Sequence, residues 1–195
     1  MKNSIQTAKT YILEHKRETV IGVVLALIVA GLITLFVYNT MPHVVYKPTN
    51  ACDMLTPSKA QDLLGEKVIS VDTKGAAISG DIAISKCSYT DSNEVKELMI
   101  VAAIAVRSGI NGAGVLKNKK DFAASRANDT VENVEGIGDS AYFNPLRGQL
   151  NILEGRRWII VSYGIGTSPE TNTVDKALEL ANVALDYPLF QLTKF

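Results

Sequence analysis

Histidine and cysteine are scarce in this sequence of 195 residues, which restricts the active sites that the chain can build. His15 and His43 are the two histidines, and Cys52 and Cys87 are the two cysteines. A hydrolase needs a nucleophile, a base and an orienting group in one pocket, and residues 44–195 offer no histidine as the base. A metal site also needs more ligands of these types. We therefore expect no enzymatic activity, no metal and no cofactor.

A phosphate-binding loop and an excess of basic residues are also missing. The motif GxxxxGK does not occur, and residues 39–195 contain 16 basic and 18 acidic residues. Two short segments gather basic residues that could face anionic headgroups, wall polymers or solvent: Lys117, Lys119, Lys120, Arg147, Arg156 and Arg157. Because the net charge is slightly negative, we interpret these residues as a solvated surface and expect no nucleic-acid binding.

Charge is absent from residues 19–38, TVIGVVLALIVAGLITLFVY. A helix of this length covers roughly the 30 Å hydrocarbon core of a bilayer. Residues 1–18 contain four basic residues, whereas Lys47 is the one basic residue between the apolar segment and Cys52. This asymmetry predicts a cytoplasmic amino terminus. We expect a single-pass protein of the cell membrane with a cytoplasmic tail (1–18), a transmembrane helix (19–38), a linker (39–51) and an extracytoplasmic domain (52–195).

A cleaved signal peptide is the main alternative to an uncleaved anchor, but the sequence after the apolar segment lacks a small-x-small cleavage pattern. A lipoprotein is disfavoured because no aliphatic residue precedes Cys52 at the expected spacing. Within the anchor, small residues recur every four positions, at Gly22, Ala26, Ala30 and Thr34. Such a row lets two helices pack closely in lipid, so these residues are a candidate face for homodimerisation. The alternative is that Gly and Ala are simply common in membrane helices.

Two cysteines in an oxidising compartment, with none left over, predict one disulfide between Cys52 and Cys87. The bridge would close a loop of about 35 residues and stabilise the domain by roughly 3–4 kcal/mol. The alternatives are a redox pair, which is usually CxxC, and a catalytic cysteine, which needs a partner base.

Periodicity after residue 51 predicts an α+β fold, a mostly antiparallel sheet flanked by helices in the order helix, three strands, helix, three strands, helix. The first helix follows Thr56 as its cap, begins at Pro57 and ends at Gly65. The expected strands are 67–73, 81–91, 97–108, 140–143 and a hairpin over 149–165, and the expected later helices are 115–127 and 174–186. Inward-facing residues are predicted to be Ile82, Ile84, Cys87 and Tyr89 in the second strand, Leu116, Phe122, Ala123 and Ala127 in the middle helix, and Leu178, Ala181, Val183 and Leu185 in the last helix.

The segment GIGDSAYF is the most specific candidate for a binding turn. Gly136 and Gly138 give the backbone freedom, and Asp139 is placed to hold a cation or a polar ligand. The alternative is that the glycines form a bend and Asp139 accepts hydrogen bonds from nearby backbone amides.

Several short patterns together resemble a family, the small cell-envelope domains of uncharacterised actinobacterial lipoproteins, including the LpqN-like group. The similar residues, spread over roughly 51–187, are Cys52, Leu55, Thr56, Leu64, Gly65, Cys87, Ser88, Tyr89, Gly136, Gly138, Asp139, Ala141, Leu180 and Ala181. The resemblance implies a PsbP-like α/β/α sandwich with the two cysteines bridged, and it implies binding rather than an established chemistry. The chain departs from the group because a transmembrane helix replaces acylation at a lipobox cysteine.

These observations predict a membrane-anchored, extracytoplasmic binding or interaction protein of the bacterial cell envelope. Its expected partners are the membrane and an unidentified envelope protein or wall component. The alternative is an accessory or sensing subunit of a membrane complex that acts through its transmembrane helix.

Overall fold

The computed structural model describes residues 24, 27–32, 44–65, 68–91, 99–128, 130–165 and 169–186. The chain divides into two compact units, Met1–His43 and Val44–Phe195, and each is described by itself. In the first unit, residues 24 and 27–32 are helical, and their large apolar side chains are exposed.

The predicted transmembrane segment, residues 19–38, lies mostly outside the described residues. The same holds for Gly22, Ala26 and Thr34 of the candidate packing face, whereas Ala30 is helical and exposed. Within the part of the chain that the structure describes, no helix has the length and apolar character needed to cross a membrane. The anchor and its packing face therefore stay predictions.

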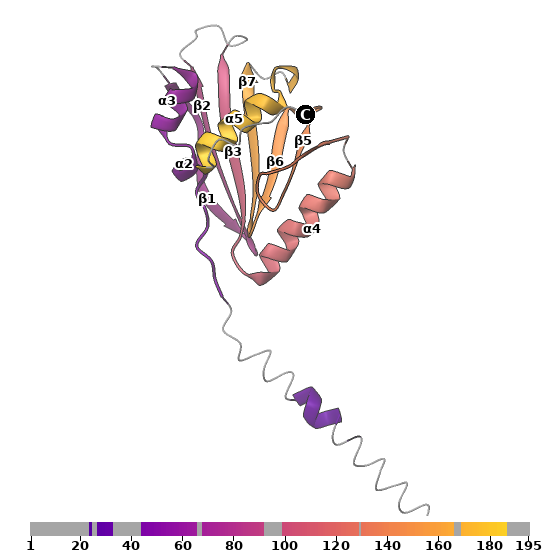
Figure 1. Ribbon diagram of the computed structural model, residues 1–195. Coiled ribbons are helices and arrows are strands. Elements are labelled where there is room, and N and C mark those ends of the chain that lie inside the picture. Colours follow the sequence, from indigo (N-terminus) through magenta and orange to yellow (C-terminus); the bar gives the residue numbers. More distant parts are fainter. Residues whose placement is uncertain are drawn as a thin grey trace, which may run out of the picture. The chain divides into compact units, whose positions relative to one another are not determined.

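The second unit combines helices with a sheet of strands (Figure 1). In chain order its elements are α2 (Ala51–Met54), α3 (Pro57–Leu64), β1 (Val68–Ser79), β2 (Ile82–Asp91), β3 (Ile100–Gly109), α4 (Gly112–Asn128), β4 (Glu132–Val134), β5 (Ser140–Asn144), β6 (Gln149–Glu154), β7 (Arg157–Ile165), the 3₁₀ helix η2 (Pro169–Thr171) and α5 (Val174–Leu185). The seven strands form one sheet in the order β1-β2-β3-β7-β6-β5-β4. All neighbouring pairs are antiparallel.

This architecture confirms the predicted α+β class and antiparallel sheet. The prediction missed α2 and β4, because elements of four and three residues are too short to show a hydrophobic period. The helix α3 begins and ends where its capping residues predicted. The Thr56 side chain accepts a hydrogen bond from the Lys59 amide at 3.3 Å, and Pro57 is the first helical residue. Gly65 ends the helix with a φ of 101°.

Successive residues of β7 point to opposite faces of the sheet, as the alternating sequence predicted. Ile159 and Val161 face a core that α2, α3 and α5 cover, which we call the apolar face. Trp158 and Ile160 face a smaller cluster around Phe122 of α4, which we call the α4 face. Figure 1 shows α4 apart from the other three helices.

Four residues that were predicted to face inward are exposed instead: Ile84, Leu116, Ala123 and Ala127. Ile84 is 50% exposed because it lies on the α4 face of β2, whereas α4 packs against β3 and β7. In α4, Phe122 is buried as predicted, but Leu116, Ala123 and Ala127 are exposed. The buried residues of α4 are Gly114, Asn118 and Phe122, and those of α5 are Ala177, Leu180, Ala181 and Ala184. In α5, Ala181 is buried as predicted, Leu178 and Leu185 are partly buried against the core, and Val183 is partly exposed.

Candidate functional site

The turn that precedes β5 needs glycine at two positions. Gly136 and Gly138 have φ angles of 79° and 61°, in the left-handed region where a Cβ is unfavourable. A Cβ at Gly138 would also lie 2.6 Å from the Leu153 carbonyl oxygen and 2.7 Å from the Ile152 side chain. The turn thus packs directly onto β6, and Gly138 has a structural role.

Asp139 uses its polar atoms within the protein. Its carboxylate accepts a hydrogen bond from the Gly155 amide at 2.7 Å, and its own amide donates to the Leu153 carbonyl at 2.7 Å. The side chain therefore joins this turn to the turn between β6 and β7. Of the two interpretations of the sequence, this geometry fits the one in which Asp139 bonds backbone amides.

A hollow of about 350 Å³ lies beside the same turn, between β4 and the amino-terminal half of α5. We call it the β4–α5 hollow. Its apolar lining residues are Val134, Ile137, Val174 and Leu178. Ile137 is 6% exposed and belongs to the core of the apolar face, and the other three pack against that core. An apolar group that entered the hollow would therefore contact side chains that the fold already holds in place.

The charged residues of the β4–α5 hollow are all acidic. Glu132 is the first residue of β4, and Glu135 directly follows its last residue, Val134. Asp175 lies in the first turn of α5. All three are exposed. The rest of the lining is Asn133, Gly136 and Asn182, so among the described residues no lysine, arginine or histidine lines the hollow. Because carboxylates at the rim attract cations, the hollow suits a ligand that combines a basic group with an apolar part.

The opposite side of β4 is held by α4. The Arg126 guanidinium donates hydrogen bonds to the Asn133 side chain at 2.6 Å and to the Ser140 hydroxyl at 3.3 Å. β4 is an edge strand of three residues, so these bonds add to the few that its neighbour β5 provides. The wall of the hollow is thereby fixed from both sides.

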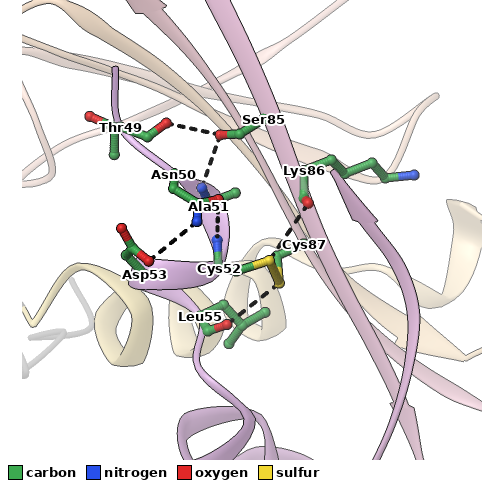
Figure 2. The surroundings of a disulfide bond; sticks show 9 residues. All are labelled: Thr49, Asn50, Ala51, Cys52, Asp53, Leu55, Ser85, Lys86 and Cys87. Carbon is green, nitrogen blue, oxygen red and sulfur yellow. Dashed lines mark hydrogen bonds between the residues drawn. A yellow bond between two sulfur atoms is a disulfide. The ribbon is translucent and has the colours of Figure 1, made fainter. Parts of the chain in front are cut away.

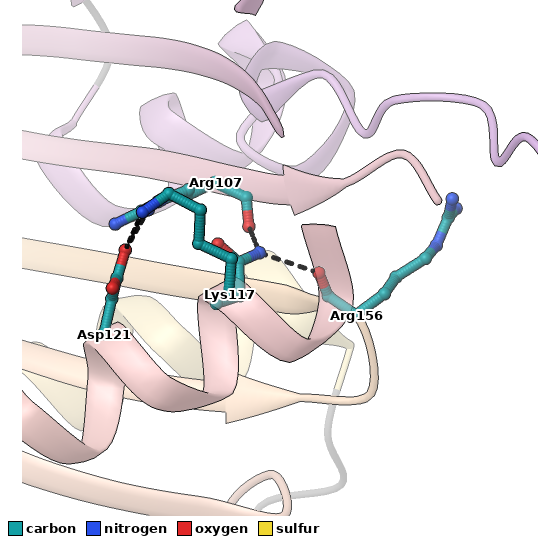
Figure 3. Close-up of polar contacts among 5 residues, drawn as sticks. Arg107, Lys117, Asp121 and Arg156 are labelled. Atoms are coloured by element: carbon teal, nitrogen blue, oxygen red, sulfur yellow. Dashed lines mark hydrogen bonds and ion pairs between the residues drawn. The ribbon is translucent and has the colours of Figure 1, made fainter. Parts of the chain in front are cut away.

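A buried amide joins α4 to the sheet, and Figure 3 labels the two residues that accept its hydrogen bonds, Arg107 and Arg156. The Asn118 side chain is fully buried and donates hydrogen bonds to the carbonyl oxygens of Arg107 at 2.8 Å and Arg156 at 3.0 Å. The Arg107 carbonyl lies near the end of β3, and the Arg156 carbonyl lies in the turn between β6 and β7. Within the described residues, the Asn118 side-chain oxygen has no hydrogen-bond partner. This amide therefore ties α4 to β3 and to the turn between β6 and β7.

Ion pairs surround the Asn118 tie. The Arg107 guanidinium pairs with Asp121 and lies 5.4 Å from the centre of the Trp158 ring, while Lys117 is 3.2 Å from the same carboxylate. The hydrogen bond from Arg107, more than that from Lys117, lowers the pKa of Asp121 below its ordinary value, against the smaller opposing effect of desolvation. The α4 face is thus stabilised by charge as well as by apolar contact.

The two cysteines form the predicted disulfide, Cys52–Cys87, which joins α2 to β2 (Figure 2). Cys87 is fully buried in the core of the apolar face. Its sulfur lies 3.7 Å from the Leu55 carbonyl oxygen, and since a bridged sulfur carries no proton, this is a packing contact. Beside the bridge, the Ser85 hydroxyl accepts from the Ala51 amide at 2.9 Å and donates to the Thr49 carbonyl at 3.0 Å. The chain is therefore fastened to the sheet where the domain begins.

The sequence pattern pointed to the turn but not to the hollow beside it. The α5 residues Asp175 and Leu178 were not candidates, and neither were the carboxylates of Glu132 and Glu135. No local pattern pointed to the hollow, because in the sequence VENVE Glu132 and Val134 are two positions apart and share one face of a strand, so neither face is purely charged or purely apolar.

Among the described residues, no group of three or more His, Cys, Asp and Glu side chains is placed to hold a metal ion. Comparison of the chain with protein-family models, curated protein sequences and solved structures found no match.

Proposed function

We propose that this chain is a membrane-anchored extracytoplasmic protein that binds a basic, partly apolar ligand in the β4–α5 hollow. The observation that carries the proposal is the hollow itself, in which three carboxylates surround a floor of aliphatic side chains. Binding pockets in proteins commonly combine such an apolar floor with a few polar groups that orient the ligand. The LpqN-like resemblance, which implies binding domains, supports the same function.

The proposed location depends on two further observations. Residues 19–38 contain no charge, and the basic residues concentrate before them, which favours an anchor with an outer carboxyl-terminal domain. The Cys52–Cys87 bridge supports an oxidising compartment, because disulfides persist there and are rare in the cytosol. Envelope proteins or wall peptides with basic side chains are the proposed class of partner.

Two short peptides of opposite charge test the proposed site. The full chain, held in lipid nanodiscs, is titrated with a fluorescent peptide of alternating Lys and Leu and with its Glu and Leu counterpart. We expect the basic peptide to bind and the acidic one not to bind. The double variant Glu132→Gln/Glu135→Gln should lower the affinity for the basic peptide by about fivefold or more, because the interaction with one nearby charge is worth about 1 kcal/mol even in water.

Asp62→Asn is the matched control, since it removes an exposed carboxylate of α3 outside the hollow. The affinity of this variant for the basic peptide should equal that of the wild-type chain. Equal affinity for both peptides, or equal losses in the control and the double variant, would contradict the proposal. A chain that binds the basic peptide only after deletion of residues 187–195 would also contradict it, because the hollow would then serve the protein's own terminus.

A further inference from the structure

The described residues of the second unit have a strongly uneven distribution of charge. Residues 44–47, 80–81, 109–120 and 155–156, which we call the basic end, contain five basic residues and one acidic residue. The remaining described residues from 48 to 186 contain eight basic and thirteen acidic residues. A nearly neutral domain is thus divided into a positive end and a negative remainder.

Direct contacts show that the basic end is one surface. Arg156 donates a hydrogen bond to the Lys47 carbonyl at 2.8 Å, and its guanidinium lies 5.2 Å from the centre of the Tyr46 ring. The Tyr46 amide donates to the Ile110 carbonyl at 2.7 Å. The Arg156 carbonyl also accepts a hydrogen bond from the Asn118 side chain. This bond brings Lys117 and Lys119, which flank Asn118 in α4, close to the turn between β6 and β7.

The structure separates the six basic residues that the sequence grouped. Arg157 pairs with Glu154, and Arg147 lies at the opposite end of β6 from Arg156. Lys119 and Lys120 are exposed, and the structure records no ion pair for either of them among the described residues. Lys47 is likewise exposed. These three positive charges are therefore free to meet an external anion.

Apolar side chains are exposed at the same end. Val44, Val45 and Leu116 are 56%, 75% and 69% exposed, respectively. Leu116 lies on α4 between the exposed residues Ala113 and Lys120, on the side away from the buried Asn118. A surface that presents lysines around aliphatic side chains matches the interface of an anionic bilayer, where both kinds of group are stabilised.

The short chain between the predicted anchor and the domain favours the membrane as the occupant. The predicted anchor ends at Tyr38, and Tyr46 is already hydrogen-bonded to the domain through its amide and the Ile110 carbonyl. The eight intervening steps span at most about 28 Å when fully extended. If the anchor lies in the bilayer, the basic end is the part of the domain that the linker keeps near the headgroups.

We infer that the basic end docks onto the anionic surface of the membrane that holds the anchor, with Leu116 at the interface and Lys47, Lys119 and Lys120 facing the headgroups. This inference rests on the anchor of the proposed function and is independent of the ligand of the β4–α5 hollow. Docking would hold the acidic remainder of the domain, including the hollow, away from the lipid.

Lipid-borne quenching measures this contact directly. The variants Leu116→Cys and Leu146→Cys each carry one fluorophore on the added thiol, and the full chain is placed in nanodiscs that contain a headgroup-nitroxide lipid. Leu146 is the matched control because it is 74% exposed and lies at the opposite end of β6 from Arg156, roughly 20 Å away. The bilayer is phosphatidylcholine, alone or mixed with phosphatidylglycerol.

We expect quenching at Leu116→Cys to exceed that at Leu146→Cys several-fold in the anionic bilayer. It should fall to the control level in phosphatidylcholine alone, at high salt, or after Lys119→Glu/Lys120→Glu. Each basic residue near an anionic surface changes the affinity about fivefold, so reversing two charges should abolish the contact.

Equal quenching at both positions in the anionic bilayer would overturn the inference. Quenching at Leu116→Cys that does not respond to lipid charge or to the double variant would overturn it as well. Failure of the chain to enter nanodiscs at all would refute the anchor, and this inference with it, whereas a chain that inserts without selective quenching would refute the docking alone.

Discussion

On the apolar face of the sheet, α2, α3 and α5 cover buried aliphatic side chains such as Ile104 and Ile159, and a disulfide fastens α2 to β2. On the α4 face, one helix contacts the sheet through a smaller cluster around Phe122, the Asn118 amide and the ion pair of Arg107 with Asp121. Apolar burial and covalent links respond little to salt, whereas partly exposed ion pairs are screened by it. We therefore expect the two faces to contribute differently to stability when solution conditions change.

The disulfide should give the largest effect, on the apolar face. The double variant Cys52→Ser/Cys87→Ser should lose about 3–4 kcal/mol in the free energy of unfolding, because the unfolded chain regains the freedom of a loop of 35 residues. Urea denaturation of the full chain measures this loss. A reductant should destabilise the wild-type chain by a similar amount and leave the variant unchanged. A loss below about 1 kcal/mol would show that the bridge adds little to this face.

The Asn118 tie should give the next largest effect, on the α4 face. Asn118→Ala removes two buried hydrogen bonds and should cost about 1–3 kcal/mol in the free energy of unfolding. Lys120→Ala is the control on the same helix, since this exposed side chain should change stability by less than about 0.5 kcal/mol. If the two variants unfold at the same urea concentration, α4 is held by its aromatic contacts alone.

The ion pair of Asp121 should give the smallest effect, and it should depend on pH. Asp121→Asn should lose less than about 1 kcal/mol, because the carboxylate is partly exposed and salt screens the pair. Arg107 and then Lys117 lower the pKa of Asp121 in the folded state, so the pair stabilises the protein above the ordinary carboxyl range, near pH 4. The stabilisation is lost as the pH falls from there through the lowered pKa.

Wild type and Asp121→Asn should therefore differ in stability by a constant amount from about pH 5 to pH 8 and converge below about pH 4. Denaturant titration of both chains across this range measures the difference, and high salt should reduce it at neutral pH. A difference that grows as the pH falls would have the wrong sign for this ion pair.

Local signals made part of the fold predictable. Thr56, Pro57 and Gly65 fixed the bounds of α3 because capping depends on residues within a few positions. The strands of the hairpin were equally clear, since Ile159 and Val161 alternate with their neighbours around a tight turn at Gly155. The pairing of Cys52 with Cys87 followed from there being two cysteines.

The orientation of α4 and the position of the hollow depend on contacts between distant segments. Burial of Asn118 is favourable because two carbonyl groups, one of them 38 residues away, accept its hydrogen bonds. Hydrophobicity alone does not reveal these bonds, and it predicted Leu116 as the buried residue instead. The hollow forms where β4 meets α5, and the sequence alone does not bring Glu135 and Asp175 together. Long-range hydrogen bonds and packing decided these features.

The central claim is that the domain with the disulfide lies outside the cell, and thiol labelling of intact cells tests it most directly. Cells that produce the full chain are treated with a membrane-impermeant maleimide, with and without an impermeant reductant, and the protein is weighed. Leu146→Cys provides a reporter on an exposed residue of the same domain. The account predicts that Leu146→Cys labels without reduction and that Cys52, which is partly exposed, labels only after reduction. The contrary result is that Leu146→Cys and both native cysteines label only after lysis and without a reductant. It would place an unbridged domain in the cytoplasm and contradict the account.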